Sequence, residues 1–214
     1  MSGRTSRTGD RTAPRAWQRM LSGRRLDLLE PSPLDIEIGD IAHGLARVAR
    51  WNGQTVGDQA YSVAQHSLAV EIAFAMIAGK ATAEERMIAL LHDAPEYVIG
   101  DMISPFKAVM GGAYKSVEKR LATAIHLRFA LPGELSPTLL ARIKRADQIC
   151  AYFEATRLAG FTESEALAFF GRPGPVTHEN LPIDPLAPGE AQARFHARFE
   201  VLDAERARTE TRAE

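Results

Sequence analysis

Hydrophobic residues recur along most of the chain at the three- and four-residue spacing of an amphipathic α-helix. The segments with this pattern are residues 37–50, 61–79, 82–100, 113–131, 136–160 and 187–208. The short stretch PLDIEI, at residues 33–38, alternates in a way that would allow a brief strand. The pattern as a whole predicts an all-α bundle of six or more helices.

Local signals support several of these helix boundaries. Thr82 and Glu85 have the spacing of a capping box at the start of one helix. Ser136 has the position of an N-cap, and Gly160 has the position of a stop signal at the end of the same helix. Pro95 is expected to end or kink the helix that contains it, because its ring cannot continue the backbone hydrogen bonds.

The two ends of the chain differ from this helical body. Residues 1–25 carry seven arginines, and Asp10 is the single acidic residue among them. We expect residues 1–30 to be a basic, flexible tail, either a solvated extension or, alternatively, an arm for nucleic acid. Residues 206–214 are expected to be a polar C-terminal tail, with the character of a helix end. Residues 31–205 are expected to form one domain.

Composition narrows the class of protein. The formal net charge of −1 does not favour a protein that binds polyanions with its whole surface. Cys150 is the single cysteine, so a disulfide framework is excluded and a reducing compartment is favoured. No apolar run reaches the roughly 18 residues of a membrane span, and the N-terminus lacks the apolar segment of a secretion signal. We therefore expect a cytoplasmic protein without a membrane partner.

Four residues of metal-ligating type lie in apolar sequence on three predicted helices: His66, the pair His92 and Asp93, and Asp147. Facing helices can direct such side chains into one interior site. A lone histidine is ordinarily a satisfied core residue, but four buried polar groups would each need a partner, whereas one cation satisfies them all. The set predicts one divalent transition metal ion, such as Co, Mn, Fe, Ni or Zn; structural zinc is disfavoured because the chain has one cysteine.

The order of these residues resembles the signature of the HD-domain phosphohydrolases, in which a histidine, a later His-Asp pair and a distant aspartate follow one another. Here the motifs read AQHSLAV (64–70), LLHDAPE (90–96) and KRADQI (144–149). The stretches ARW (49–51) and DMISPFK (101–107) resemble motifs of the YfbR-like 5′-deoxynucleotidases and of a related phage enzyme type that removes phosphate from deoxyadenosine nucleotides. The resemblance covers about residues 35–170 and leaves both tails outside.

The resemblance implies an HD-domain helical bundle and a metal-dependent phosphohydrolase that removes the 5′-phosphate from deoxynucleoside monophosphates. In such an enzyme, the metal acts as a Lewis acid and lowers the pKa of the attacking water. A deoxynucleoside di- or triphosphate phosphohydrolase, similar to a dATPase, is the alternative substrate class. A non-catalytic nucleotide sensor is an alternative from another functional class. Members of the family are often dimeric, so a homodimer is also implied.

The resemblance assigns catalytic roles to two carboxylates. Glu96 matches the family's residue that orients or deprotonates the attacking water, and it lies four residues after His92, on the same face if the helix continues through Pro95. The competing interpretation of Glu96 is an exposed carboxylate at a helix end. Asp101 matches a second acidic residue near the leaving 5′-oxygen, where it would donate a proton or hold the substrate. Alternatively, Asp101 caps the next turn.

Four further residues are candidates for substrate binding. Arg50 and Trp51 match residues that contact the phosphate and the sugar: a guanidinium can bind phosphate with two N–H groups, and an indole can pack on a deoxyribose and exclude a 2′-hydroxyl. Trp51 is equally consistent with a core anchor. Lys107 and Lys144 could reach phosphate oxygens, although lysines are ordinarily solvated surface residues.

The remaining histidines favour a single metal ion. A dinuclear HD site needs further histidines between the His-Asp pair and the last aspartate, and His126 is the only one in that interval. We therefore expect one metal ion and a structural role for His126. Cys150, one helical turn after Asp147, is expected to be a small buried residue, because no base for a thiol nucleophile lies near it in the sequence.

Overall fold

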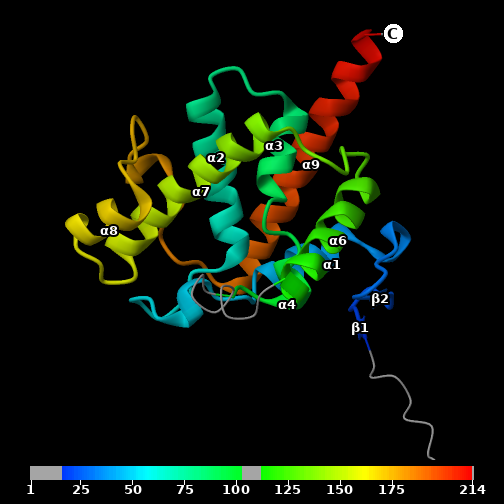
Figure 1. Cartoon of the computed structure of the whole chain (residues 1–214), viewed down its shortest axis with the longest axis horizontal. Helices are drawn as coiled ribbons and strands as arrows, with labels where there is room; N and C mark the ends of the chain where they lie inside the picture. Colours follow the sequence, from blue (N-terminus) through cyan, green and yellow to red (C-terminus); the bar gives the residue numbers. More distant parts are fainter. Residues whose placement is uncertain (1–15, 103–111, 214) are drawn as a thin grey trace, which may run out of the picture.

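The structure is a computed structural model that describes residues 16–102 and 112–213. Helices account for nearly all of the regular structure in these residues, beside one short β-hairpin (Figure 1). The predicted all-α architecture is therefore confirmed. Across both described ranges, no helix combines the length and the apolar character that crossing a membrane requires.

The helices carry the labels of Figure 1: α1 (Ile38–Leu45), α2 (Val63–Ala78), α3 (Ala83–Leu90), α4 (Glu96–Ile99), α6 (Gly112–Arg128), α7 (Pro137–Arg157), α8 (Glu163–Phe170) and α9 (Pro188–Ala213). The strands β1 (Trp17–Arg19) and β2 (Arg25–Asp27) pair in antiparallel orientation, with Gln18 opposite Leu26. Short 3₁₀ turns occur at η1 (Pro33–Asp35), η2 (Arg50–Gly53) and η3 (His178–Asn180).

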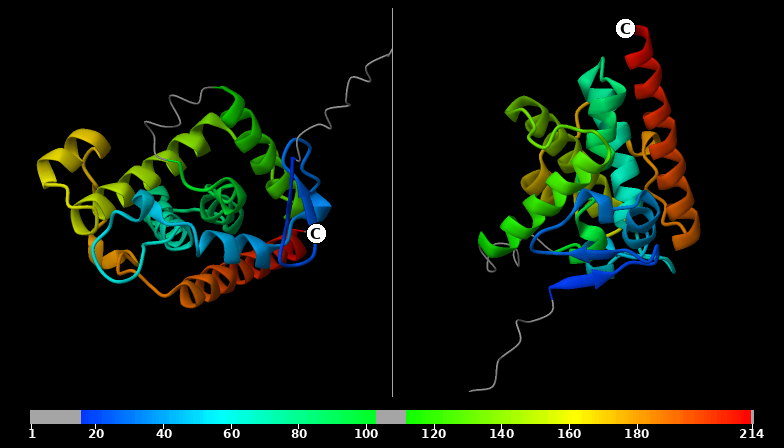
Figure 2. Two further views of the ribbon diagram at one scale, coloured as in Figure 1. Left: turned by 90° about the horizontal axis from the view of Figure 1, so that it is seen from below. Right: turned by 90° about the vertical axis from the view of Figure 1, so that its right-hand side faces the viewer.

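Helix α2 is the central element of the bundle. Every residue from Val63 to Glu71 is buried, and the helix contacts α3, α7 and α9. Seen from below, α2 and α3 are viewed nearly end-on, with α6 and α7 to one side and α9 to the other (Figure 2). Ser62 caps the helix by accepting a hydrogen bond from the Gln65 N–H, and Gly79, at φ 70°, ends it. A helix enclosed in this way presents its polar side chains to an interior site rather than to water.

Helix α1 is shorter than the sequence pattern predicted. It ends at Leu45, before Arg50, because the following segment pairs with the chain that leads into α2. The N–H of Val63 donates to the Val48 carbonyl at 2.9 Å, and the N–H of Arg50 donates to the Tyr61 carbonyl at 2.8 Å. This pairing places Arg50 beside the N-terminal end of the central helix.

The predicted helix over residues 82–100 is divided in two. It starts at the predicted capping box, but α3 ends at Leu90 and α4 begins at Glu96. His92 and Asp93 therefore lie in a turn, which contains i→i+3 hydrogen bonds such as that from the Glu96 N–H to the Asp93 carbonyl (3.0 Å). The proline before Glu96 interrupts the helix, as its missing N–H predicted.

An ordered hairpin corrects part of the predicted flexible tail over residues 1–30. Strands β1 and β2 lie within that range, and Leu26 on β2 is fully buried. Ser22, between the strands, donates its N–H and its hydroxyl to the carboxylate of Asp40 at 3.0 and 2.5 Å. These contacts with the bundle hold strands of three residues, which are too short to show an alternation in the sequence. Residues 1–15 lie outside the described part of the chain.

Residues 33–38 do not form the strand that their alternation allowed. Ser32 accepts a hydrogen bond from the backbone N–H of Leu34, and with Pro33 in the first position the chain makes the 3₁₀ turn η1. The backbone then enters α1 at Ile38. Local side-chain bonding has therefore replaced the ladder hydrogen bonds that a strand would need.

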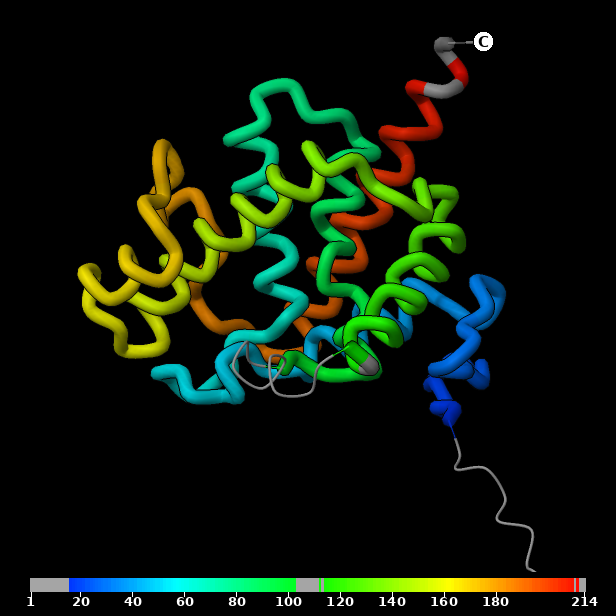
Figure 3. Tube along the Cα trace, in the orientation of Figure 1, coloured from blue at the N-terminus to red at the C-terminus, as the bar shows by residue number. Residues whose placement is uncertain are grey.

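The C-terminal residues continue helix α9 beyond the predicted domain boundary at residue 205. The last turns of α9 extend past the body of the bundle (Figure 3). Arg206 is nevertheless 8% exposed, and its guanidinium donates to the carbonyl oxygens of Phe129 and Ala130 at 3.0 Å. The predicted polar tail over residues 206–214 therefore begins with a residue that belongs to the domain.

Helices α1 and α4 approach each other closely at Gly44. A β-carbon at this position would lie 2.7 Å from the carbonyl oxygen of Tyr97 and 2.8 Å from its β-carbon. Nonbonded atoms do not approach so closely, so the contact requires glycine. Because Tyr97 follows Glu96 on α4, this contact limits where the helix that begins with Glu96 can lie.

A buried carboxylate, Glu71, links α2 to two neighbouring helices. It accepts hydrogen bonds from Arg86 on α3 (2.5 Å) and from Arg198 on α9 (2.9 and 3.0 Å). We expect Glu71→Ala to lower the free energy of unfolding by about 3 kcal/mol, because it removes the partner of both guanidinium groups. The arginine side chains are 29% and 23% exposed, so partial hydration keeps the loss at the lower end of the usual range.

Urea denaturation followed by circular dichroism measures this loss. Glu200→Ala is the matched control, because Glu200 also lies on a helix that carries one of the arginines but has a side chain that is 66% exposed. We expect the control to change the free energy of unfolding by less than about 0.5 kcal/mol. A loss below about 1 kcal/mol in Glu71→Ala would mean that the paired charges contribute little to the fold.

Candidate metal centre and active site

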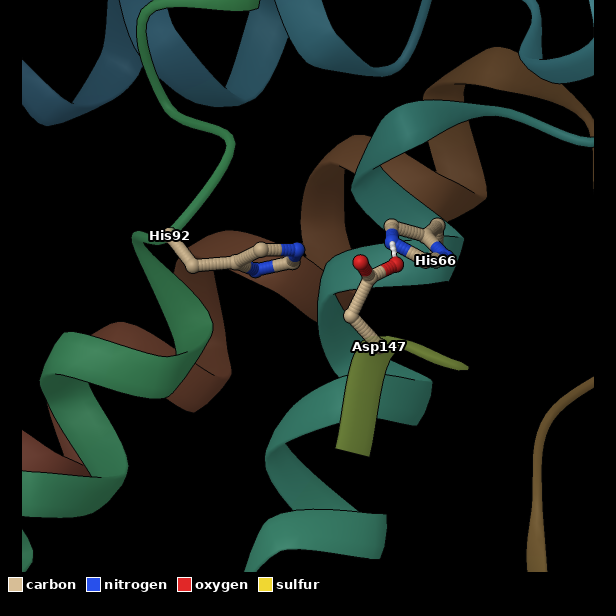
Figure 4. Close-up of side chains that lie close together, drawn as sticks. All are labelled: His66, His92 and Asp147. Atoms are coloured by element: carbon tan, nitrogen blue, oxygen red, sulfur yellow. Dashed lines mark ion pairs between the residues drawn. The ribbon is translucent and has the colours of Figure 1, made fainter. Parts of the chain in front are cut away.

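The four metal-ligand candidates converge from three parts of the bundle. His66 projects from α2, Asp147 from α7, and His92 and Asp93 from the turn between α3 and α4. Figure 4 shows the side chains of His66, His92 and Asp147 pointing toward one another. Each of these three offers one ligand atom, and the atoms all lie within 4.8 Å of one another. The structure thus brings together residues that lie far apart in the sequence.

Asp93 completes the group by linking the two histidines. Its Oδ2 atom lies 3.1 Å from His92 Nε2 and 3.5 Å from His66 Nε2. Asp147 Oδ1 lies 3.4 Å from the same His66 nitrogen. The His66 side chain is fully buried, whereas those of Asp93 and Asp147 are 25% and 18% exposed. Solvent therefore reaches the group from the side of the aspartates.

Both histidines are anchored through the ring nitrogen that points away from the group. His66 Nδ1 lies 2.5 Å from a carboxylate oxygen of Glu154, and His92 Nδ1 lies 2.9 Å from the carbonyl oxygen of Ala89. With Nδ1–H as the donor in each bond, the Nε2 atom of each ring points into the group and carries the lone pair when the ring is neutral. Among the described residues, neither buried Nε2 atom has a hydrogen-bond partner of acceptable geometry.

The charges in the group favour a bound cation. Burial alone raises the pKa of Asp93 and of Asp147, but His66 and His92 outweigh burial and hold both pKa values well below their ordinary range. Burial and Arg50 lower the pKa of His66, but Glu154 and Asp147 outweigh them and raise it to about 10. Without a metal, a proton on His66 therefore supplies the positive charge that the carboxylates demand.

These side chains fit a divalent transition metal ion. Two imidazole nitrogens and two carboxylate oxygens are available, and a mixed nitrogen and oxygen donor set suits Mn, Fe, Co, Ni or Zn. The two buried Nε2 atoms are the observation that supports the fit, because a buried polar atom ordinarily has a partner and a cation would provide it. The Nδ1 contacts provide the outer hydrogen bonds that metal-ligating histidines usually make.

Glu96 is the first residue of α4 and is 2% exposed, so the interpretation as an exposed carboxylate at a helix end is wrong. The four-residue spacing from His92 to Glu96 does not lie on one continuous helix. Because the preceding turn contains i→i+3 hydrogen bonds, residues three apart lie above one another, and Glu96 follows Asp93 by three. Glu96 therefore follows Asp93 by one tight turn, and does not follow His92 by one turn of a continuous helix.

Arg50 is held between two carboxylates at the edge of the group. Its Nη1 donates to Asp101 Oδ2 at 3.1 Å, and its Nε donates to Glu154 Oε2 at 3.2 Å. Glu154 and Asp101 overcome the effect of burial and raise the pKa of Arg50 further above its ordinary value. A guanidinium has five N–H donors, so three remain for a phosphate after these two bonds. One carboxylate oxygen of Asp101 thus contacts Arg50. The turn that Asp101 would cap in the alternative interpretation includes residues outside the described part of the chain.

Trp51 is fixed by its indole N–H and by neighbouring rings. The N–H donates to Glu154 Oε2 at 2.9 Å, and the ring centroid lies 5.6 Å from that of Phe161 and 6.0 Å from that of Phe170. The packing supports the interpretation of Trp51 as a core anchor.

Trp51 and Asn52 have φ values of 57° and 51°, a left-handed conformation that costs about 1 kcal/mol or more for each residue. Such strain is tolerated where surrounding contacts fix the backbone.

Comparison with known proteins identifies the family of this chain. A sequence profile of the family described as "5′-deoxynucleotidase YfbR-like" matches residues 40–165, a range that includes all four metal-ligand candidates. The chain belongs to the YfbR-like family. The expected resemblance to the HD-domain phosphohydrolases is therefore confirmed at the level of the family.

Two relatives extend the similarity beyond the matched range. An uncharacterized protein of Rhodobacter capsulatus is 57% identical over 188 residues, which are 88% of this chain and 96% of that protein. The uncharacterized protein YfdR of Escherichia coli is 31% identical over 168 residues, which are 78% of this chain and 85% of that protein. The alignments span most of both relatives, so the similarity to them extends beyond residues 40–165.

Of the two lysines predicted to bind substrate in this YfbR-like chain, the structure describes Lys144. Lys144 on α7 has a side chain that is 68% exposed, and its Nζ lies 2.6 Å from Asp147 Oδ2, at the solvent-facing side of the group. Lys107 lies outside the described residues.

His126 lies on α6 and its Nδ1 contacts the carbonyl oxygen of Pro132 at 2.9 Å. Burial there lowers the pKa of His126 despite this bond.

Sequence reasoning missed Glu154, the carboxylate that contacts His66, Arg50 and Trp51. Glu154 is fully buried, and its pKa is lowered to about 2 because His66 and Arg50 outweigh the opposing effect of burial. A signal was present: Glu154 follows Asp147 by seven residues, which is two helical turns on the same face, and it comes directly after the apolar run ICAYF. Cys150, also predicted to be buried, has no exposed surface.

Metal binding and protonation are expected to compete at His66 of this YfbR-like site. Because the pKa of His66 without metal is about 10 and the ordinary value is 6.5, a cation has to displace a proton at neutral pH. We expect the metal-induced rise in Tm to grow from about pH 6 to about pH 9. The proton's own contribution runs in the opposite direction: it is complete below pH 6.5 and is lost as the pH rises toward 10.

Differential scanning fluorimetry with and without Mn²⁺, after treatment with a chelator, measures this competition. His196→Gln is a matched control, because His196 lies on α9 with a side chain that is 37% exposed, and its removal should leave the pH dependence unchanged. A metal-induced rise in Tm that is constant across this pH range would show that no proton leaves the site when the cation binds.

Proposed function

We propose that this chain is a metal-dependent phosphohydrolase that removes the 5′-phosphate from deoxynucleoside monophosphates. The observation that supports the proposal most strongly is the convergence of two histidines and two aspartates in a member of the YfbR-like family, with the buried Glu96 three residues after Asp93. A buried cluster of this kind is costly unless a cation occupies it, and a cation beside a carboxylate base suits hydrolysis of a phosphate ester.

The proposed ligands of one divalent ion (Co, Mn, Fe, Ni or Zn) are His66, His92, Asp93 and Asp147. When bound, the ion supplies a Lewis acid that polarises the phosphate and lowers the pKa of the attacking water. The contribution of the chain is to hold the two imidazoles with Nε2 inward, through the Nδ1 contacts, and to leave the aspartate side open to solvent.

Glu96 is the proposed base. It accepts a proton from water as the water oxygen forms a bond to phosphorus and the bond from phosphorus to the 5′-oxygen breaks. The 5′-oxygen takes up a proton from solvent to become the hydroxyl of the nucleoside, and Glu96 returns its proton to solvent after the phosphate leaves. Burial of Glu96 in the tight turn after Asp93 supports the role, because a base must be held within hydrogen-bond reach of the water it activates.

Arg50, Asp101 and Trp51 are the proposed substrate contacts. The three N–H groups of Arg50 that remain after its bonds to Asp101 and Glu154 would donate to phosphate oxygens. Asp101 already accepts a hydrogen bond from Arg50, so we propose that it holds the substrate through its remaining acceptor positions. The indole of Trp51, fixed by Glu154, would pack on the deoxyribose; Lys107 and Lys144 would add charge near the phosphate.

A panel of nucleotides tests this proposal. Deoxynucleoside mono-, di- and triphosphates and the matching ribonucleotides are incubated with the purified protein and Mn²⁺ or Co²⁺, and released phosphate and pyrophosphate are measured. We expect phosphate from the monophosphates and a preference for deoxyribose. Release from di- or triphosphates instead would favour the dATPase-like alternative, which shares the same metal chemistry.

A non-catalytic nucleotide sensor makes a different prediction in the same assay. It would bind nucleotides tightly, as isothermal titration calorimetry measures, without turnover in the presence of any divalent metal. Absence of turnover on the whole panel would therefore contradict the enzyme proposal. Glu96→Gln serves as the matched negative control, because it has nearly the shape of the native side chain but cannot accept a proton in the same way.

A further inference from the structure

Glu154 lies behind the metal-ligand candidates, and three N–H groups converge on its carboxylate. Oε1 lies 2.5 Å from His66 Nδ1, while Oε2 accepts hydrogen bonds from Arg50 Nε at 3.2 Å and from Trp51 Nε1 at 2.9 Å. The residue is fully buried on α7. One side chain therefore contacts a metal-ligand candidate and two substrate-binding candidates, without itself facing the aspartates of the group.

The chemistry of these contacts determines the state of the His66 ring. A carboxylate only accepts hydrogen bonds, so the atom that His66 offers to Glu154 has to be a protonated Nδ1. When the ring is neutral, its lone pair is then on Nε2, which lies 3.4 to 3.5 Å from oxygens of Asp147 and Asp93. A metal ion accepts only an unprotonated imidazole nitrogen, so this tautomer is the one that binding requires.

We infer that Glu154 is a positioning residue, which holds His66 in the tautomer and orientation needed for metal binding and ties Arg50 and Trp51 to the same carboxylate. The inference rests on the proposed metal site but is independent of the identity of the substrate. Its second part follows from the backbone: Trp51 and Asn52 occupy a left-handed conformation, and the indole bond to Glu154 helps to hold that strained turn beside the site.

Glu154→Gln distinguishes this role from simple packing, because glutamine has nearly the same shape but only one acceptor oxygen. If that oxygen continues to accept from Arg50 and Trp51, the amide NH₂ faces His66 Nδ1 and can only donate. The neutral ring must then carry its proton on Nε2, where it blocks the metal. The reverse orientation would direct the amide NH₂ at two donors, so the first orientation satisfies more hydrogen bonds.

The experiment measures Zn²⁺ affinity by competition with a chromophoric chelator, in wild type and in Glu154→Gln. We expect the dissociation constant to rise by about 10- to 100-fold, the usual effect of losing an outer partner of a ligating histidine. Glu71→Gln is the matched control: Glu71 is also a buried carboxylate that accepts from arginines, but it lies five residues after His66 on α2, where its partners are Arg86 on α3 and Arg198 on α9. Its Zn²⁺ affinity should remain that of wild type.

A second measurement does not depend on the variant being folded. In the zinc-loaded wild-type protein, two-dimensional ¹H–¹⁵N spectra of the histidine rings should show His66 protonated on Nδ1, with a downfield and slowly exchanging proton. A proton on Nε2 of His66, unchanged affinity in Glu154→Gln, or an equal loss in Glu71→Gln would each overturn the inference. Wild-type protein that binds no Zn²⁺ would overturn the metal site itself, a failure distinct from absence of nucleotide turnover.

Discussion

Glu96→Gln is expected to lower the kcat for phosphate release by about 10²- to 10⁴-fold, while the metal content of the protein stays at the wild-type level. Glutamine fills nearly the same volume as the native side chain, so the buried start of α4 should remain in place. It cannot accept the proton of an attacking water, however, and the step would then have to proceed without a base. Steady-state kinetics and mass-spectrometric metal analysis of the same preparation measure both quantities.

The two measurements together separate three roles of Glu96. Loss of turnover with retained metal supports the assignment as a base. Loss of metal as well would place Glu96 among the ligands instead, and a variant that stays fully active would show that the base assignment is wrong. Glu163→Gln is a suitable control, because Glu163 also lies in the first turn of a short helix, α8, but is exposed.

Asp93→Ala is expected to abolish detectable activity and to raise the dissociation constant of the metal by at least about 100-fold. The carboxylate of Asp93 is within 3.1 Å of His92 Nε2 and 3.5 Å of His66 Nε2, so its removal takes away a charged ligand placed between two neutral ones. A hard anionic oxygen contributes strongly to binding of a divalent ion, and alanine offers no replacement. Calorimetric titration of the chelator-treated protein with Mn²⁺ gives the affinity directly.

The control for this variant is Asp58→Ala, which removes an exposed carboxylate from the loop before α2 and should leave metal binding unchanged. Metal bound to Asp93→Ala with wild-type affinity would remove Asp93 from the ligand set. The smaller group of His66, His92 and Asp147, whose ligand atoms lie within 4.8 Å of one another, would then be the protein contribution.

The positions of the long helices could be predicted from the sequence because local signals and packing agree there. Gly79 follows the last residue of α2, and the N-cap Ser136 precedes Pro137, the first residue of α7, so a cap, a proline and a glycine mark these helix ends. The metal-ligand candidates on these helices could also be found, since each is a polar residue in an apolar run. Their convergence follows from the packing of α2 against α7.

The features that could not be predicted depend on contacts between distant segments. Helix α1 ends before Arg50 because residues near Val48 pair with the chain before α2, a contact that no local pattern reveals. The hairpin at β1 and β2 likewise depends on Leu26 and Ser22 contacting the bundle. The two separate helices around His92 follow from one proline, whose position was visible but whose effect on the turn geometry was not.

Glu154 shows a different kind of omission. Residue types that bind metals or activate water were the signal for the candidates that face one another around His66 Nε2. Glu154 instead contacts the opposite nitrogen of His66, Nδ1. The signal for such a residue is a charge in a buried helical segment, two turns from a ligand candidate. The second nitrogen of a metal-ligating histidine needs a hydrogen-bond acceptor, and this requirement is what predicts a residue such as Glu154.

The close approach at Gly44 has a consequence for how this domain can change during evolution or design. Gly44 offers no functional group, yet any larger side chain there would push against Tyr97 and displace the short helix that starts with the candidate base. In a saturation library selected for turnover, position 44 should therefore tolerate as little variation as the chemically active positions. Restriction of a residue in such a library would then report an absence of space, and not a role in the reaction.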